Sequence, residues 1–429
     1  MLRNRWIPLV VALSCSGVVL LPGAARGAGF IFYEVGAQEV GLASAGFSAR
    51  ADSPSTLLTN PAGLTRVDGT QVQVGAQLVY AHLEFAHDAQ TDPILGTNNG
   101  GNAVGAVPTV GVFSSFAPWR DVHFGVGFFT NFGAPQSWDP PWVGRYYATK
   151  TTLIGLSLMP AVGWHITDGL SVGAAMNLMY GILKQVAAVQ NLEPQATDGS
   201  IEVSAHAVGV GGNVGVLYQL SPATRFGLTY TSPVKLGFSN PPTFTGLGPG
   251  IGAAIRAAGL DTTIVDVGVT VPQTVMLGFY QAIGDRWAIL GDVGWQNWAA
   301  FGAVEIGVSS VPPRSLTTKI SYDNTWHVGL GAQVQLSEPW RLHFGAAYDS
   351  SMTSDENRSL SLSLASQLRL GAGAQVVLDR HWDLGFASEF LWGGSPRVDV
   401  EHGPLSGHVS GSYASTWFVF FAFSFTWKG

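Results

Sequence analysis

Hydrophobic and polar residues alternate along much of this chain with a period of two. Between Trp340 and Asp349, every second residue is apolar or aromatic, and the residues between them are polar, charged or small. The same alternation runs through 71–80, 326–336 and 367–379. A period of two is that of a β-strand, and about ten residues let a tilted strand cross a bilayer. The second face is rich in Gly and Gln, which is typical of a strand that faces a polar lumen.

Fourteen segments of this kind are predicted to form one all-β fold, a transmembrane antiparallel up-and-down β-barrel. They span 70–84, 106–117, 121–132, 150–167, 169–190, 200–220, 224–238, 265–283, 286–308, 315–336, 340–349, 366–379, 381–392 and 411–427. An even number is usual for bacterial barrels made of a single chain. Short turns, such as Gly284-Asp285, alternate with long loops, such as 239–264. Because the short turns of such barrels are periplasmic, both chain ends are expected in the periplasm.

The tryptophans agree with this orientation. Six of them lie within a few residues of a short turn or of the C-terminus: Trp119, Trp164, Trp287, Trp340, Trp382 and Trp427. Indole prefers the interface between membrane and water, so these residues predict a periplasmic aromatic girdle. The alternative is that Trp simply ends strands here, as it does in many β proteins.

The composition argues against a soluble protein and against a bundle of transmembrane helices. Hydrophobic residues make up 46% of the chain and charged residues 11%, whereas the usual charged share is about 25%. A helical membrane protein would show several apolar runs of roughly 20 residues. Only the N-terminus carries such a run, after Arg3 and Arg5 and before Ala25-Arg26-Gly27. Residues 1–27 therefore read as a cleaved secretory signal, with an uncleaved anchor as the alternative.

The mature chain would begin at Ala28 and carry 18 basic and 28 acidic residues, a net charge of −10. This balance disfavours nucleic acid as a partner. The single cysteine, Cys15, lies within the signal, so the mature chain is expected to have no disulfide, thiolate metal site or cysteine nucleophile. A lipoprotein acceptor at Cys15 is the alternative, but the preceding Ala12-Leu13-Ser14 fits that role poorly.

Residues 28–69 do not alternate and are rich in Gly, Ala and Ser. A barrel of about fourteen strands encloses a lumen wider than its own side chains can fill. We therefore predict three parts: a signal peptide at 1–27, a hatch inside the lumen at 28–69, and a transmembrane barrel at 70–429.

Several short motifs are distributed along the mature chain. Those near its start are Ala28-Gly29-Phe30, Gly41-Leu42-Ala43-Ser44-Ala45-Gly46, Ala51-Asp52 and Asn60-Pro61-Ala62-Gly63-Leu64. Later motifs are Trp142-Val143-Gly144-Arg145-Tyr146-Tyr147, Tyr230-Thr231-Ser232-Pro233, Val271-Pro272-Gln273 and Gly291-Asp292-Val293-Gly294-Trp295-Gln296-Asn297-Trp298. In these motifs the sequence resembles the FadL-type outer-membrane transporters, over nearly the whole mature chain. Asn-Pro-Ala alone is a weak signal, but together with the mature N-terminus and the Trp-x-x-Trp strand it is a strong one.

The resemblance implies a channel in the outer membrane of a Gram-negative bacterium for passive uptake of hydrophobic small molecules. Long-chain fatty acids are expected first, and aromatic hydrocarbons are the alternative substrate. The ligand would pass from an outer groove to a deeper pocket and leave sideways near a kinked third strand. Lateral release is physically reasonable, because an apolar solute gains nothing by entering water. Besides the substrate, the expected partners are the lipid bilayer, lipopolysaccharide and the barrel assembly machinery, and the protein is expected to be a monomer.

Eight residues are candidates for ligand binding or gating: Phe30, Phe32, Asn60, Pro61, Ala62, Gly133, Arg145 and Lys150. Phe30 and Phe32 would line the inner pocket, or pack the hatch against the wall. Asn60 and Pro61 would shape a hatch turn that moves when ligand binds, or form a plain turn. Gly133 would kink the third strand, or mark the start of a loop.

A fatty-acid carboxylate would need a cation nearby. Five cations lie near the outer half of the predicted barrel: Arg145, Lys150, Lys184, Lys235 and Arg256. The sequence does not choose among them, and each is also explained as a solvated or lumenal charge. A polar network along the inner wall is expected from His327, Arg341, His343, Asp349, Asp383 and Glu389.

The chain is not expected to be an enzyme or to bind a cofactor or metal. No motif brings Ser and His together, and no metal-binding spacing occurs. The glycine-rich run 209–215 is an incomplete dinucleotide fingerprint inside a strand. Two further functions remain open: a general porin, which opposed charges at a constriction would favour, and a structural, adhesive or enzymatic barrel.

Overall fold

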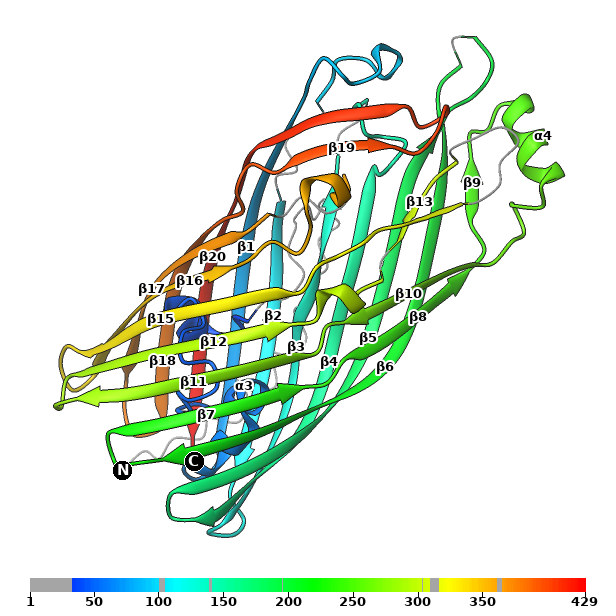
Figure 1. Cartoon of the computed structure of the whole chain (residues 1–429). Coiled ribbons are helices and arrows are strands. Elements are labelled where there is room, and N and C mark those ends of the chain that lie inside the picture. The colour runs from blue at the N-terminus through cyan, green and yellow to red at the C-terminus, as the bar shows by residue number, and fades with distance from the viewer. Residues whose placement is uncertain are drawn as a thin grey trace, which may run out of the picture.

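The computed structural model describes residues 33–99, 105–138, 141–194, 196–302, 304–308, 316–360 and 365–429. Its body is a closed antiparallel barrel of fourteen strands in which the last strand pairs with the first (Figure 1). Around the ring, the strands are β1 Gln71–His87, β2 Gly105–Phe116, β3 Val122–Ser137, β4 Lys150–Thr167, β5 Leu170–Val189, β6 Gly199–Gln219, β7 Thr224–Thr231, β11 Thr274–Ile283, β12 Trp287–Gln296, β15 Thr325–Gln335, β16 Trp340–Asp349, β17 Gln367–Val377, β18 Trp382–Trp392 and β20 His408–Lys428. The predicted fold class is confirmed, while the expected signal at 1–27 lies outside the described residues.

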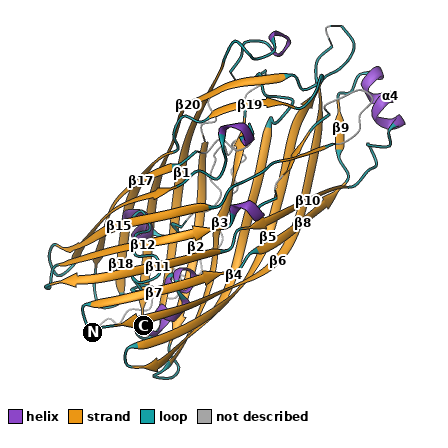
Figure 2. Cartoon of the chain, in the orientation of Figure 1, coloured by secondary structure: helices purple, strands orange, loops and turns teal. Residues whose placement is uncertain are grey.

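Shorter strands and helical segments complete the chain and are not part of the ring of fourteen strands (Figure 2). The additional strands are β8 Val234–Asn240 and β10 Val265–Val271, which form a hairpin, β13 Val304–Ile306 and β14 Thr317–Lys319, which form another, β9 Thr243–Thr245 beside β6, and β19 Arg397–Glu401 beside β20. The helical segments are α2 Ala37–Gly41, α3 Thr56–Thr59, η1 Pro61–Arg66, η2 Pro93–Leu95, α4 Pro249–Ala257, η3 Trp298–Ala300 and η4 Asp355–Asn357. None of the described helices is long and apolar enough to cross a membrane.

Wall side chains alternate between the outside and the lumen, as the sequence pattern predicts. On β15, Trp326 and Val328 are exposed outward, whereas His327 between them is fully buried. Exposed Trp and Tyr side chains gather near both ends of the strands. At the short-turn end they are Trp119, Trp164, Tyr218, Trp287, Trp340 and Trp427, and near the loop end they are Tyr180, Tyr230, Trp326, Tyr348 and Trp392. Two such girdles bracket the bilayer.

Several predicted strands have different ends in the structure. The segments 224–238 and 265–283 are each interrupted, at Ser232-Pro233 and at Pro272-Gln273. Proline has no N–H to donate and therefore ends a strand ladder. Beyond these breaks, β8 and β10 pair with each other and leave the ring.

Three other strand ends also differ from the prediction. The segment 286–308 is a ring strand only to Gln296, because the Asn297 side chain accepts a hydrogen bond from the Ala300 N–H and begins η3. The segment 315–336 becomes a ring strand only at Thr325, and β3 continues past the predicted 132 to Ser137.

The described part of the predicted hatch, residues 33–69, lies inside the barrel (Figure 1). Its residues from 33 to 65 are nearly all buried. The helix α2 contacts β16, β17, β18 and β20, whereas η1 contacts β3, β4, β5 and β6 on another side of the lumen. The segment therefore touches the inner wall on both sides.

Candidate functional site

The Asn-Pro-Ala turn is fastened to both the hatch and the wall. The Asn60 side chain accepts a hydrogen bond from the Ala62 N–H at 3.1 Å and donates to the Ser48 carbonyl at 2.7 Å. It also donates to the carbonyl of Val216 on β6 at 3.0 Å. A Cβ on Gly215 would lie 2.0 Å from Asn60 Oδ1, so only glycine lets the turn approach β6 this closely. Asn60 is thus a fixed link between hatch and barrel.

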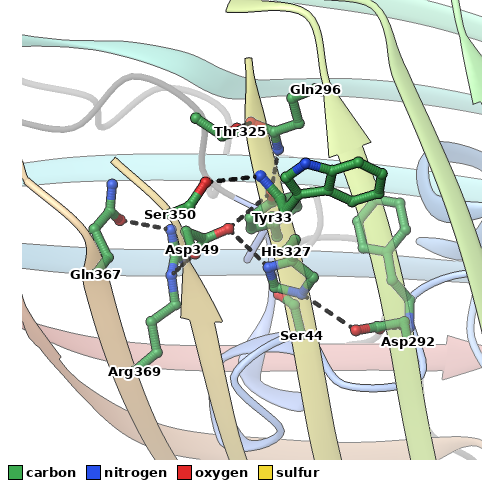
Figure 3. A network of polar contacts seen from close by, with 12 residues as sticks. Tyr33, Ser44, Asp292, Gln296, Thr325, His327, Asp349, Ser350, Gln367 and Arg369 are labelled. Atoms are coloured by element: carbon green, nitrogen blue, oxygen red, sulfur yellow. Dashed lines mark hydrogen bonds and ion pairs between the residues drawn. The ribbon is translucent and has the colours of Figure 1, made fainter. Parts of the chain in front are cut away.

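A network of buried polar groups joins the hatch to strands β12, β15, β16 and β17 (Figure 3). At its centre, Asp349 Oδ1 lies 2.8 Å from His327 Nδ1 and accepts a hydrogen bond from the Tyr33 hydroxyl at 3.2 Å. Asp349 Oδ2 accepts from Arg369 Nε at 3.0 Å. On the other side of the imidazole, His327 Nε2 lies 3.2 Å from Asp292 Oδ1. The five side chains form one continuous chain of contacts across four wall strands and the hatch.

A hatch carboxylate, Glu34, extends this network. Its Oε1 accepts hydrogen bonds from Arg369 Nη1 at 2.7 Å and from the Ser44 hydroxyl at 3.1 Å. Glu389 of β18 is buried with its carboxylate 3.9 Å from the same guanidinium. Removing one partner from a set of buried charges is strongly unfavourable, so these contacts hold the start of the described hatch against β15–β18.

A small cavity of about 30 Å³ lies beside this network. Its lining includes Tyr33, Gln296, Trp298, Met352, Gln367 and Arg369. Such a volume accommodates a few water molecules. A molecule much larger than water can contact Arg369 here only if Tyr33 and its neighbours move.

Toward the outer loops, the lumen is apolar. Phe85 on β1 packs edge-on against Trp142 and Tyr413, with ring centroids 6.2 and 5.3 Å away. Trp142 stacks on Trp138 at 4.5 Å. These rings belong to one large buried cluster that also contains Leu83, Phe132, Leu183, Phe301, Leu391 and Phe420. The polar network therefore borders on an apolar outer lumen.

The backbone pairing between β2 and β3 covers only part of the two strands. The two strands pair only where 111–116 faces 124–129, although both continue toward the loops. The register of β3 against β4 shifts between Thr130 and Phe132, and Gly133 has a φ of 88°. A Cβ at Gly133 would lie 1.7 Å from the Leu153 carbonyl oxygen, so glycine permits this bulge. Gly133 lies within a continuing strand and not at a loop start.

Arg145 and Lys150 are placed away from the lumenal network. Arg145 Nε donates to Asp198 Oδ2 at 2.7 Å, and Nη1 donates to the Leu95 carbonyl at 2.9 Å. The neighbouring Tyr146 hydroxyl donates to Asp198 Oδ1 at 2.8 Å, and burial together with this bond raises the pKa of Tyr146 to about 12. Arg145 therefore ties outer loops together. Lys150 is exposed at the outer end of β4.

The eight candidate residues do not converge on one site. Asn60, Pro61 and Ala62 lie together in the hatch, Gly133 lies in the wall, and Phe30 and Phe32 lie outside the described residues. The expected polar wall network contains His327, Asp349 and Glu389. Sequence reasoning missed Tyr33, Glu34, Asp292 and Arg369 as its partners. The lumenal side of Arg369 was visible in the alternation of 367–379, but nothing in the sequence paired it with Glu34.

Comparison with known proteins agrees with this geometry. Residues 18–416 match the family described as "Outer membrane protein transport protein (OMPP1/FadL/TodX)". The chain belongs to this FadL/TodX family. Members of the family are transport channels, not enzymes, and this family member is a channel for hydrophobic substrates in the outer membrane.

Similar members of the FadL/TodX family include curated proteins of two bacteria. Outer membrane protein P1 of Haemophilus influenzae is 25% identical over 377 residues, which cover 79% of this chain and 80% of that protein. The long-chain fatty acid transport protein of Salmonella typhi is 24% identical over 422 residues, which cover 92% and 94% of the two chains.

Solved structures of the FadL/TodX family share the fold. A Pseudomonas aeruginosa FadL homologue superposes with a TM-score of 0.83 at 18% identity, covering 94% of this chain and 100% of the other. The toluene transporter TbuX of Ralstonia pickettii gives a TM-score of 0.64 at 16% identity, covering 92% and 98%.

Proposed function

We propose that this FadL/TodX family member takes up long-chain fatty acids by passive diffusion. The observation that carries the proposal is the position of Arg369. It is the cation among the described residues that line the cavity, and it lies where the polar network borders on the apolar outer lumen. A guanidinium binds carboxylates with strong charge-assisted hydrogen bonds. An apolar lumen beside it suits the alkyl chain of the same molecule.

The hatch carboxylate Glu34 occupies the position that a substrate carboxylate would take. Glu34 Oε1 lies 2.7 Å from Arg369 Nη1. A fatty acid that replaced Glu34 would preserve the charge pairing of Arg369 while releasing Glu34 from β17. The exchange of one carboxylate for another avoids leaving the buried guanidinium of Arg369 unpaired.

Residues 28–69 act in this proposal as a hatch, and the substrate leaves sideways between β2 and β3. The missing pairing outside 111 and 129 supports this route, because no backbone hydrogen bonds between the two strands must break there. The hatch side chains that face this wall are the apolar Leu57, Leu58 and Leu64. An apolar substrate can replace their contacts without exposing polar groups.

The test is uptake of radiolabelled oleate and of toluene by a bacterium that lacks its own transporters and expresses this chain. Arg369→Gln is expected to abolish most oleate uptake and to leave toluene uptake unchanged. Arg341→Gln is the matched control, because Arg341 also points inward but bonds Gln335 at 3.0 Å and is absent from the cavity lining. Equal oleate uptake by both variants would show that Arg369 does not bind the substrate carboxylate.

Uptake of aromatic hydrocarbons is the second candidate. It is favoured by the engagement of Arg369 with Asp349 and Glu34, which leaves the outer lumen itself apolar. Efficient toluene uptake without oleate uptake by the unmodified chain would support this function. Free passage of small sugars without either substrate would instead support a general porin.

A further inference from the structure

The ring of paired strands has a second interruption, along the outer half of β6. This strand pairs with β7 over 213–219 and with β9 over 200–202. Between these stretches no described strand pairs with that edge. Instead, β8 steps toward the lumen, where a Cβ on Gly209 would lie 2.5 Å from Val234 Cγ1 and 2.7 Å from the Lys235 carbonyl oxygen. The edge of β6 is thus left uncovered on the outside.

Two sets of hydrogen bonds bound this stretch. At its inner end, the Ser232 N–H donates to the Gly212 carbonyl at 2.7 Å, and the Gly212 N–H donates to the Ser232 hydroxyl at 2.8 Å. At its outer end, the Asn240 side chain donates to the Ser204 carbonyl at 2.5 Å. Backbone groups of alternate residues face the same edge of a strand. Those of three residues therefore face the uncovered side, which we call the β6 window: His206, Val208 and Val210.

The window lies at the outer girdle of the barrel. Val208 is directly opposite Tyr180 in the β5–β6 register, and Tyr180 is one of the exposed aromatic residues of that girdle. The His206 ring stacks on Tyr180 with centroids 5.5 Å apart. An open strand edge is not tolerated against hydrocarbon, because its backbone groups would lose their hydrogen bonds. A ligand that covers the window must therefore be both apolar and able to form hydrogen bonds.

The side chains around the window are also of two kinds, apolar and charged. Val208 is 71% exposed and Val210 is 60% exposed. Lys235 is exposed on the outer face of the β8–β10 hairpin beside them, and none of the described acidic groups forms an ion pair with it. Gly237 lies opposite Gly268 in that hairpin, and both have open space where a Cβ would be. The hairpin therefore offers a flat floor with one cation at its side.

We propose that the β6 window binds a phosphate-bearing lipid of the outer leaflet, such as lipopolysaccharide. Its phosphate is held by Lys235 and by the free N–H groups of the window, and an acyl chain lies along Val208 and Val210. The one carboxylate on the same face of the hairpin, Asp266, is bonded to the Ser239 hydroxyl farther toward the hairpin tip. This lipid site is independent of the substrate route through the lumen.

Lipid retention tests whether the charge of Lys235 contributes to lipid binding. The intact protein is purified from outer membranes in mild detergent, and bound lipopolysaccharide is counted by native mass spectrometry. Reversing a cation beside an anionic headgroup weakens binding by about ten-fold, so Lys235→Glu should lose most of the bound lipid. Lys150→Glu is the matched control, because Lys150 is also an exposed strand lysine near the outer end. Equal retention by the two variants would overturn the proposal.

Cysteine labelling tests whether the lipid lies at the β6 window. The sequence has one cysteine, Cys15, so Val208→Cys adds a single thiol to the barrel. Vesicles containing lipopolysaccharide should slow its reaction with a maleimide relative to phosphatidylcholine vesicles. Val328→Cys, on the fully paired strand β15, should react equally in both. Equal rates at Val208 in the two lipids would overturn the proposal, as would disulfide dimers at Val208, because a second copy of the chain would then cover the edge.

Discussion

The hatch meets the barrel in two chemically different ways. Toward β2 and β3 it presents Leu57, Leu58 and Leu64 to Phe113 and Phe129, and the contact is apolar. Beyond these strands Thr65 bonds to Ser171 of β5. Toward β12–β18 it presents Tyr33 and Glu34 to a network of buried charges. Apolar contacts are non-directional and can be exchanged for contacts with an apolar substrate. Buried ion pairs fix one geometry and resist separation. We therefore expect the hatch to stay bound at β12–β18 and to part from the wall near β2 and β3, where the pairing of these two strands ends.

The largest effect on the stability of the hatch is expected from a substitution in the charged network with β12–β18. Asp349→Ala removes the carboxylate shared by His327, Arg369 and Tyr33. Because it leaves buried cationic and polar groups without that partner, it should lower the local stability of the hatch by about 3 kcal/mol. Amide hydrogen exchange of residues 33–50 measures this loss.

Glu202→Ala is the control for the removal of a carboxylate. Glu202 pairs with Lys184 at 2.6 Å, and both side chains are about one third exposed. Pairs of this kind contribute about 0–1 kcal/mol. Unchanged exchange of residues 33–50 in Asp349→Ala would mean that the network does not hold the hatch.

A second prediction compares two buried leucines on opposite sides. Leu57 packs its methyl groups near Gly125 and Gly127 of β3, and Leu290 packs against Gly46 on the charged side. Both are fully buried. Each change to alanine should cost about 2–4 kcal/mol of local stability. Leu57→Ala should also speed oleate uptake by loosening the exit side, whereas Leu290→Ala should not. Faster uptake in both variants would mean that the whole hatch moves as one body.

The bulge in β3 gives a third prediction. Gly133→Ala places a Cβ against the Leu153 carbonyl at a φ of 88°, a strain of about 1–3 kcal/mol. Straightening β3 would relieve it and let the strand pair with β2, so uptake should fall. Gly237→Ala is the control, since a Cβ there meets open space. Unimpaired uptake by Gly133→Ala would show that the bulge is not needed for passage of the substrate.

Much of this architecture was predictable because alternation is a local property. The face of each residue on 326–336 and 367–379 follows from period two alone, so the lumenal position of His327 and Arg369 could be read from the sequence. Their partners could not, because Tyr33 and Glu34 come from a segment without periodicity and meet Arg369 more than 330 residues away. The ion pair of Arg145 was not predictable for a related reason: its partner Asp198 lies on another loop, and loop contacts leave no pattern in the sequence.

The smallest effect is expected at Arg145. Its pairing with Asp198 is partly exposed, with side-chain exposures of 14% and 28%, and pairs near the surface contribute about 0–1 kcal/mol. Arg145→Gln should therefore leave oleate and toluene uptake nearly unchanged, in contrast to Arg369→Gln. If Arg145→Gln instead abolished oleate uptake and spared toluene, the carboxylate would be recognised among the outer loops. The charged network around Arg369 would then hold the hatch without binding the substrate carboxylate.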